Sequence, residues 1–93
     1  MFKINYYDKV ADDLKALDQP TQKHIFQAIN RKLAVEPFTY GKPLRYSFKA
    51  YRSLRVVNYR VVFRFFDETT LQVVLIGHRA VVYKRLLNRL STS

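Results

Sequence analysis

The stretch "YRSLRVVNYRVVFRFF", residues 51–66, decides the fold and also raises the question of what the protein binds. Valine, tyrosine and phenylalanine favour extended backbone, so this is the most strand-like part of the chain. It also holds four arginines, at positions 52, 55, 60 and 64, and no acidic residue. Positive charges without acidic partners add little to the stability of a sheet, so stability alone does not account for these four arginines.

A two-residue turn at Val57 and Asn58 would make these residues a β-hairpin, with Asn58 chosen for its tolerance of positive φ. In that register Arg55 faces Arg60, and alternate side chains point to opposite sides of the sheet. One side is apolar and is expected to meet the helices; it carries Leu54, Val56, Tyr59, Val61, Phe63 and Phe65. The other side carries Tyr51, Ser53, Arg55, Arg60, Val62, Arg64 and Phe66.

The pairing of Arg55 with Arg60 points to an anionic ligand. Like charges directly opposite on a sheet cost up to about 1 kcal/mol. An anion held between the two arginines would relieve this repulsion, and the planar guanidinium group matches phosphate. The alternative is a solvated polar face that has no ligand. Arg52 is the exception, because the register puts it on the apolar side, where it must lie at the strand end with its charged group reaching water.

The rest of the chain predicts an α+β protein made of one domain, residues 1–93. We expect a strand at 2–7, a helix within 9–17 with Asp8 as its N-cap, a second helix from Pro20 to about Val35, a loop at 36–44, a strand at 71–78 and a short C-terminal helix within 81–90. The two N-terminal helices would form a hairpin on one face of a four-stranded antiparallel sheet. The other face would be left largely open.

The overall charge supports a polyanionic partner. The chain has 17 Lys and Arg against 7 Asp and Glu, a net charge of +10, and residues 44–93 alone carry net +8 with ten bases and two acids. Such a surface gains most from nucleic acid, with an acidic protein as the alternative. There is no cysteine, and His24 and His78 could not complete a metal site alone, so we expect neither metal nor cofactor.

The N-terminal residues lack the apolar core of a signal peptide, and no apolar run is long enough to span a membrane. We therefore expect a cytoplasmic protein that does not act at a membrane.

Two segments carry a family resemblance: "RSLRVVNYRVVFRF" and "LQVVLIGHRAVVY". They resemble the signature of the RelE/ParE toxin superfamily, in which a Tyr-Arg-Val strand is followed by an aliphatic strand ending in Gly-His-Arg or Gly-Lys-Arg and then Val-Tyr. "DKVADDLKAL", the "EP" after the second helix and the "KPL" before the sheet also fit. The resemblance covers nearly the whole chain and implies a RelE-like fold.

The resemblance implies roles for individual residues. Arg60 corresponds to the sheet arginine that contacts the scissile phosphate, and Arg79 to an arginine that stabilises the transition state or acts as an acid. Tyr83 corresponds to a tyrosine that stacks on a base and assists proton transfer. Arg55, Lys49, Arg52 and Arg64 are the basic residues expected to bind nucleic acid, because Tyr51 and Ser53 stand where well-known members have lysines. Lys84, Arg85 and Arg89 are expected to form a solvated or RNA-contacting helix face.

The implied function is that of a type II toxin neutralised by a cognate antitoxin through an acidic or amphipathic segment, in a hetero-oligomer. The RelE branch cleaves mRNA on the ribosome as a metal-independent endoribonuclease. The ParE branch shares the scaffold but poisons DNA gyrase without nuclease chemistry. A basic RNA-binding module without activity is the third possibility.

Overall fold

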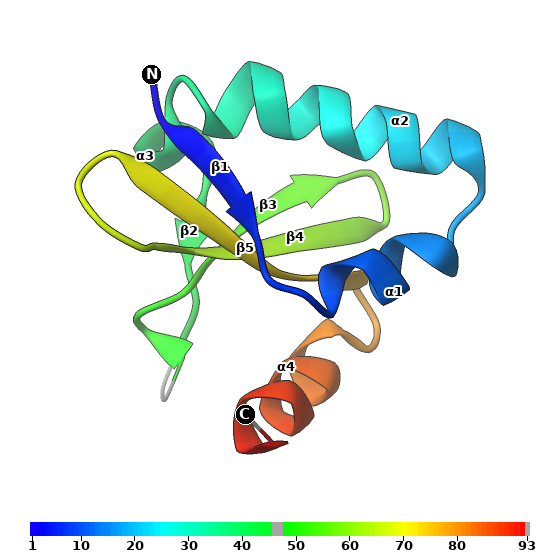
Figure 1. The fold of residues 1–93 in the computed structure, drawn as a ribbon. Helices are drawn as coiled ribbons and strands as arrows, with labels where there is room; N and C mark the ends of the chain where they lie inside the picture. The colour runs from blue at the N-terminus through cyan, green and yellow to red at the C-terminus, as the bar shows by residue number, and fades with distance from the viewer. Residues whose placement is uncertain (46–47, 93) are drawn as a thin grey trace.

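A five-stranded mixed sheet with helices on both sides forms the frame of the protein (Figure 1). This computed structural model describes residues 1–45 and 48–92. The strands are β1 (Lys3–Tyr6), β2 (Lys42–Pro43), β3 (Arg52–Val56), β4 (Tyr59–Phe65) and β5 (Thr70–His78). The helices are α1 (Val10–Lys15), α2 (Gln19–Ala28), the π-helix η1 (Ile29–Leu33), α3 (Pro37–Tyr40) and α4 (Val82–Thr92).

The sheet differs from the expected four-stranded antiparallel one. Its strand order is β1-β5-β4-β3-β2, and β1 runs parallel to β5. The additional strand, β2, comes from the segment expected to be a loop, which also contains the short helix α3. Two residues are too few to give a periodic pattern in the sequence, and Pro43 in β2 is tolerated because this strand lies at the edge of the sheet.

The register predicted for β3 and β4 is confirmed from the Arg52–Phe63 pair to the Val56–Tyr59 pair, including Arg55 opposite Arg60. The further pair predicted between Tyr51 and Arg64 lies beyond the start of β3. Arg52 lies on the apolar side at the strand end, as predicted. Its Nη1 donates to the carbonyl oxygen of Gly41 at 2.9 Å, and its guanidinium carbon lies 5.3 Å from the ring centroid of Phe38 and 5.8 Å from that of Phe65. These contacts satisfy a charge that the strand pattern forces onto the helix-covered face.

The apolar side packs under the N-terminal helices, as expected from the alternation. Ile25 and Ile29 from the helices meet Val61 and Phe63 from the sheet, and all four side chains are buried. The start of the second helix is also confirmed in outline. Asp18 accepts a hydrogen bond from the Thr21 N–H at 2.8 Å, and a proline stands in the first turn.

Asp8 was expected to cap the first helix, and that expectation is wrong. The residue before α1 is Lys9, which makes no capping bond through its side chain. The Val10 N–H instead donates to the Tyr7 carbonyl oxygen at 2.9 Å, so a backbone turn leads from β1 into the helix.

The second face of the sheet is not open, because α4 covers part of it (Figure 1). The buried residues of this smaller core are Leu44, Val62, Val74, Leu75, Val82 and Leu86. The pairing of β4 with β5 contains a register shift below α4. Val62 pairs with Leu75, but Phe63 pairs with Val73, so Val74 is an extra residue in β5. Val74 and Leu75 can then both face α4.

The turn between β3 and β4 places a valine where glycine is favoured. Val57 has φ of 54°, and it is the one non-glycine residue with positive φ in the part of the chain that the structure describes. Asn58, expected to take this conformation, does not. A positive φ at the first turn position alone is the pattern of a type II′ turn. A β-branched residue there is strained.

Replacement of Val57 by glycine is expected to stabilise the protein. Removing the Cβ relieves strain that exceeds the entropy cost of glycine, for a net gain of about 1 kcal/mol in the free energy of unfolding. Urea denaturation, followed by circular dichroism, measures this change in the free energy of unfolding. Asn58→Gly is the matched control and should give no gain; stabilisation by this control instead would mean that the turn is assigned wrongly.

Candidate nucleic-acid interface

Arg60 lies at the centre of the candidate site, on the sheet face opposite to α2. Its neighbours across the sheet are Arg55 on β3 and Gly77 on β5. Its side chain is half-buried, and Nη1 donates to the Tyr59 carbonyl oxygen at 3.0 Å. Arg55 is exposed. The hairpin register therefore places Arg55 and Arg60 opposite each other at one end of the face.

Arg79 and Tyr83 reach the same end from the segment after β5. The Arg79 N–H donates to the Asn58 carbonyl oxygen at 2.8 Å, which ties the end of β5 to the β3–β4 turn. Val82 is buried and fixes the start of α4, while the adjacent Tyr83 is 54% exposed. Tyr83 is thus held by the helix start but keeps its ring in solvent, where it can meet a ligand.

The pKa of Arg60 is influenced by each of these neighbours. Burial lowers the pKa of the Arg60 guanidinium, and the positive charges of Arg55 and Arg79 lower it further, while Tyr83 acts in the opposite direction. Arginine still carries its charge at neutral pH. Since the repulsion is strongest when no counter-ion is bound, an anion at this place would be stabilised. We call Arg55, Arg60, Arg79 and Tyr83 the arginine cluster.

The other basic residues predicted to bind nucleic acid do not join the cluster. Lys49 lies in an exposed turn ahead of β3. Arg52 lies on the helix-covered face, against Phe38 and Phe65. Arg64 shares the face of Arg60 but is bonded to Gln72, with its Nε donating to Oε1 at 2.8 Å.

His78 also lies away from the cluster. It pairs with Tyr59, and the two rings meet edge to face with centroids 5.7 Å apart. Nδ1 of His78 accepts a hydrogen bond from the Ala80 N–H at 3.1 Å. Because successive strand residues alternate, its side chain points to the opposite side of the sheet from that of Arg60.

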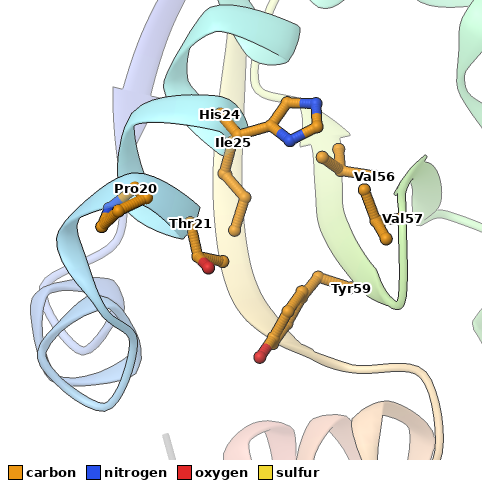
Figure 2. Close-up of a pocket in the computed structure, with 7 residues that line it drawn as sticks. All are labelled: Pro20, Thr21, His24, Ile25, Val56, Val57 and Tyr59. Atoms are coloured by element: carbon orange, nitrogen blue, oxygen red, sulfur yellow. The ribbon is translucent and has the colours of Figure 1, made fainter.

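A depression of about 290 Å³ lies on that opposite side, between the start of α2 and the β3–β4 turn (Figure 2). Its lining residues are Pro20, Thr21, His24, Ile25, Val56, Val57 and Tyr59. None of them is an arginine or a lysine. This depression lacks the charge needed to hold an anion, so the arginine cluster on the open surface remains the candidate site.

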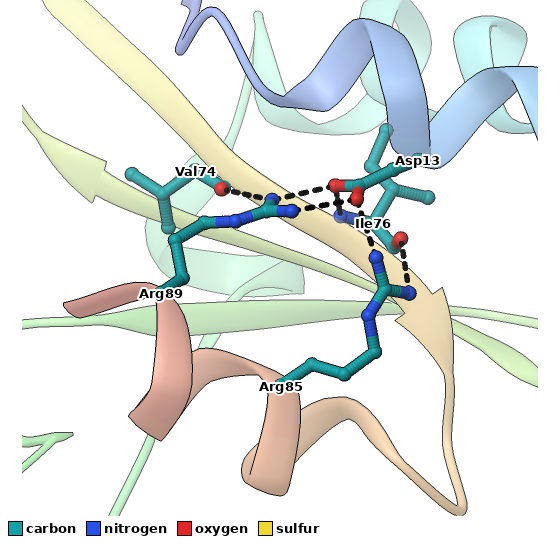
Figure 3. Close-up of polar contacts among 5 residues, drawn as sticks. All are labelled: Asp13, Val74, Ile76, Arg85 and Arg89. Carbon is teal, nitrogen blue, oxygen red and sulfur yellow. Dashed lines mark hydrogen bonds and ion pairs between the residues drawn. The ribbon is translucent and has the colours of Figure 1, made fainter. Parts of the chain in front are cut away.

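A buried carboxylate, Asp13, connects α4 to the rest of the protein (Figure 3). It accepts hydrogen bonds from Nη1 and Nη2 of Arg89, at 2.7 and 2.8 Å, and from Nη2 of Arg85. The bond to Asp13 is the main reason why the pKa of Arg89 is raised. These arginines were expected to form a solvated or RNA-contacting face, and that expectation is wrong for both. Their spacing of four residues places them on one side of a helix, but nothing in the sequence connects them to Asp13.

The same three side chains complete the edge of β5. Pairing with β1 ends near Val73, whose carbonyl oxygen accepts from the Tyr7 N–H at 2.9 Å. Beyond that point the Ile76 N–H donates to Asp13 at 2.9 Å, and Arg89 donates to the Val74 carbonyl oxygen at 3.0 Å. Side chains therefore take the place of a strand at an edge that would otherwise leave backbone groups without partners.

Residues 1–45 and 48–92 contain no group of three or more His, Cys, Asp or Glu side chains placed to hold a metal ion. Within the same ranges no helix is long and apolar enough to cross a membrane.

Comparison with known proteins identifies the family. The model of the ParE toxin of the type II toxin–antitoxin system parDE matches residues 4–83, which is most of the chain. The chain belongs to the RelE/ParE toxin superfamily. The resemblance noted in the sequence is thereby confirmed, and the protein is a type II toxin of this family.

One relative of known name is Toxin RelG of Mycobacterium tuberculosis (strain ATCC 25618 / H37Rv). It is 43% identical to this toxin over 54 residues, which are 57% of this chain and 62% of RelG. The match thus spans less than two thirds of the length of that relative.

Solved structures confirm the RelE-like fold. The toxin–antitoxin complex RelBE2 from Mycobacterium tuberculosis contains a chain with a TM-score of 0.78 and 28% identity, covering 84% of this chain and 98% of that one. A mutant of E. coli toxin RelE in complex with a peptide of antitoxin RelBc gives a TM-score of 0.66 at 17% identity, covering 90% and 93%. The second likeness shows the fold alone.

Removal of the buried carboxylate should destabilise the toxin strongly. Asp13→Ala leaves Arg89 poorly solvated and the Ile76 N–H without its acceptor, so the free energy of unfolding should fall by about 3–5 kcal/mol. Urea denaturation provides the measurement. Asp12→Ala removes an exposed acid of the same helix and should change stability by less than about 0.5 kcal/mol. Equal effects of the two substitutions would contradict the role given to Asp13.

Proposed function

We propose that this toxin is a ribosome-dependent mRNA interferase, a metal-independent endoribonuclease that acts in the cytoplasm and stops translation. The observation that carries the proposal is the arginine cluster, at the exposed end of a sheet face that α4 covers only in part. Arg55 pairs with Arg60 across the strands, and Arg55 and Arg79 both repel its charge. The exposed Tyr83 belongs to the same cluster. The name of RelG and the likeness to the RelBE2 toxin chain support the RelE branch.

The proposed reaction is cleavage of RNA by its own 2′-hydroxyl group. The 2′-oxygen attacks the adjacent phosphorus and loses its proton, and the 5′-oxygen leaves and gains one, so that a cyclic phosphate and a free 5′-hydroxyl result. The transition state carries more negative charge on the phosphate oxygens than the substrate does. Arg60 would bind these oxygens and Arg79 would stabilise the added charge, because fixed guanidinium groups need no reorganisation.

Arg55 and Tyr83 would have supporting roles. Arg55 lies opposite Arg60, and its charge would help to attract the phosphate backbone. Tyr83 has an exposed ring beside the cluster. It would stack on a base next to the scissile bond, and its hydroxyl would assist proton transfer.

The proposed partner is a cognate antitoxin with an acidic or amphipathic segment, in a hetero-oligomer. The relative RelBE2 was solved as a toxin–antitoxin complex. The net charge of +10 in this toxin would favour an acidic segment, since the partner would neutralise the repulsion within the basic surface.

A second candidate function is inhibition of DNA gyrase without nuclease chemistry. It is favoured by the match to the family model of ParE toxins. Tyr51 and Ser53 also replace the strand lysines of well-known RelE members, which leaves fewer basic groups around Arg60.

Substitution of the cluster arginines should abolish cleavage without unfolding the protein. Arg60→Ala and Arg79→Ala are each expected to lower the single-turnover rate on ribosomes programmed with mRNA by about 10²- to 10³-fold, since each removes one fixed donor. Mapping of mRNA 5′ ends gives the rate. Arg31→Ala removes an exposed charge from η1, on the other side of the sheet, and should cleave like the parent. Full activity of both cluster variants would refute the assignment.

The nuclease and the gyrase inhibitor can be told apart with two purified systems, ribosomes programmed with mRNA and DNA gyrase. The proposed nuclease should cleave mRNA on ribosomes and leave DNA supercoiling by gyrase unchanged at the same toxin concentration. Loss of supercoiling with intact mRNA would select the ParE-like function. RNA binding that is weakened by salt, without cleavage or gyrase inhibition, would identify the inactive RNA-binding module.

A further inference from the structure

Arg64, at the far end of the face that carries the arginine cluster, is held in a fixed orientation. It faces Gln72 across the β4–β5 pair, and its Nε donates to Oε1 of Gln72 at 2.8 Å. Neither terminal nitrogen of Arg64 has a hydrogen-bond partner among residues 1–45 and 48–92. The side chain therefore presents a pre-oriented pair of donors, which is the geometry that binds phosphate oxygens.

The depression beside Arg64 is suited to an anion. It measures about 160 Å³ and lies between the sheet and the end of α4. Its lining residues are Tyr7, Tyr51, Arg64, Gln72, Val74, Arg89 and Leu90. None of these is acidic, and the two tyrosine hydroxyls and the Gln72 amide can all donate hydrogen bonds.

An exposed aromatic ring completes the arrangement. Phe66 follows β4 on the same side as Arg64 and is 53% exposed, and the guanidinium carbon of Arg64 lies 5.4 Å from its ring centroid. An exposed phenylalanine beside a fixed arginine is the combination on which single-stranded nucleic acids stack their bases.

Asp67, the acid closest to Arg64 in the sequence, is engaged elsewhere. Asp67 follows Phe66 in the β4–β5 turn, where its carboxylate accepts hydrogen bonds from the backbone N–H and the hydroxyl of Thr69, at 2.9 and 3.2 Å. These bonds belong to the turn itself, so Asp67 does not pair with Arg64.

We propose that Arg64 and Phe66 form a second RNA contact, in which a phosphate of a single-stranded segment lies against the terminal nitrogens of Arg64 and the adjoining base stacks on Phe66. Gln72 positions Arg64 by accepting its Nε–H at Oε1. The inference rests on the proposed function in one respect, that RNA is the target.

This contact is separate from the arginine cluster. Arg60 and Arg64 are four residues apart on one strand, which corresponds to roughly 13 Å. Val62 lies between them and is buried in the core under α4. An RNA strand cannot follow β4 directly between the two places, so the two contacts should contribute to binding independently and without sharing a phosphate.

Binding of a short fluorescein-labelled single-stranded RNA, followed by fluorescence anisotropy over a range of salt concentrations, tests the proposal off the ribosome. Phe66→Ala should weaken binding roughly 5- to 100-fold, as expected for the loss of one stacked base, and should leave the salt dependence unchanged. Arg64→Gln should also weaken binding and should lower the slope of log Kd against log salt by about 0.7, since one phosphate contact is lost.

Two matched controls separate this effect from charge or folding alone. Arg31→Gln removes the same charge from an exposed position on η1 and should weaken binding less than about threefold. Phe66→Tyr keeps a ring and should bind as the parent does. If Phe66→Ala and Arg64→Gln bind no worse than Arg31→Gln, the second contact does not exist. Cleavage that still depends on Arg60 in those variants would leave the proposed function standing.

The contacted nucleotide has two possible sources, mRNA and ribosomal RNA. Co-sedimentation of Phe66→Ala with vacant ribosomes and with mRNA-programmed ribosomes distinguishes them. A defect seen only with programmed ribosomes assigns the nucleotide to mRNA, and a defect with both assigns it to ribosomal RNA. Parent-like sedimentation with both would overturn the proposal for the ribosome-bound state.

Discussion

The position of α4 depends on one buried carboxylate. Asp13 binds Arg85 and Arg89 and also accepts the Ile76 N–H, so a single side chain joins α1, β5 and α4. The arrangement compensates for the early end of β1, because beyond Val73 the edge of β5 is completed by side chains. Tyr83 lies in the first turn of α4, so the place of the candidate site's aromatic group also follows from this interaction.

The sheet separates two kinds of arginine. Arg52 points toward the helices and is stabilised by a carbonyl oxygen and two aromatic rings, whereas Arg55 and Arg60 repel each other on the other face. Arg85 and Arg89 both pair with Asp13, whose single negative charge offsets one of their two positive charges. The basic surface therefore contains structural arginines, whose contacts hold the helices and the sheet edge, and others that would gain from an external anion. The candidates for binding are the arginines of the cluster and, through its two terminal nitrogens, Arg64.

Contacts between residues close in the sequence could be predicted, and contacts between distant residues could not. The hairpin register needed only a turn and strict alternation, and every predicted pair from Arg52 with Phe63 to Val56 with Tyr59 is present. The parallel pairing of β1 with β5 and the strand β2 were missed. The conformation of the turn was also missed, because Val57 and not Asn58 takes the positive φ. The pairing of the two strands can force a turn residue into a backbone conformation that its side chain disfavours.

Residue order was enough to predict that Arg55 and Arg60 stand opposite each other and that Arg52 does not join them. Alternation along a strand is a local property of the backbone, so it can be derived from residue order alone. Which basic residues have acidic partners, and that α4 covers part of the second face, became known from the folded chain. Those features depend on Asp13 meeting residues more than seventy positions away, and no local pattern encodes a contact of that range.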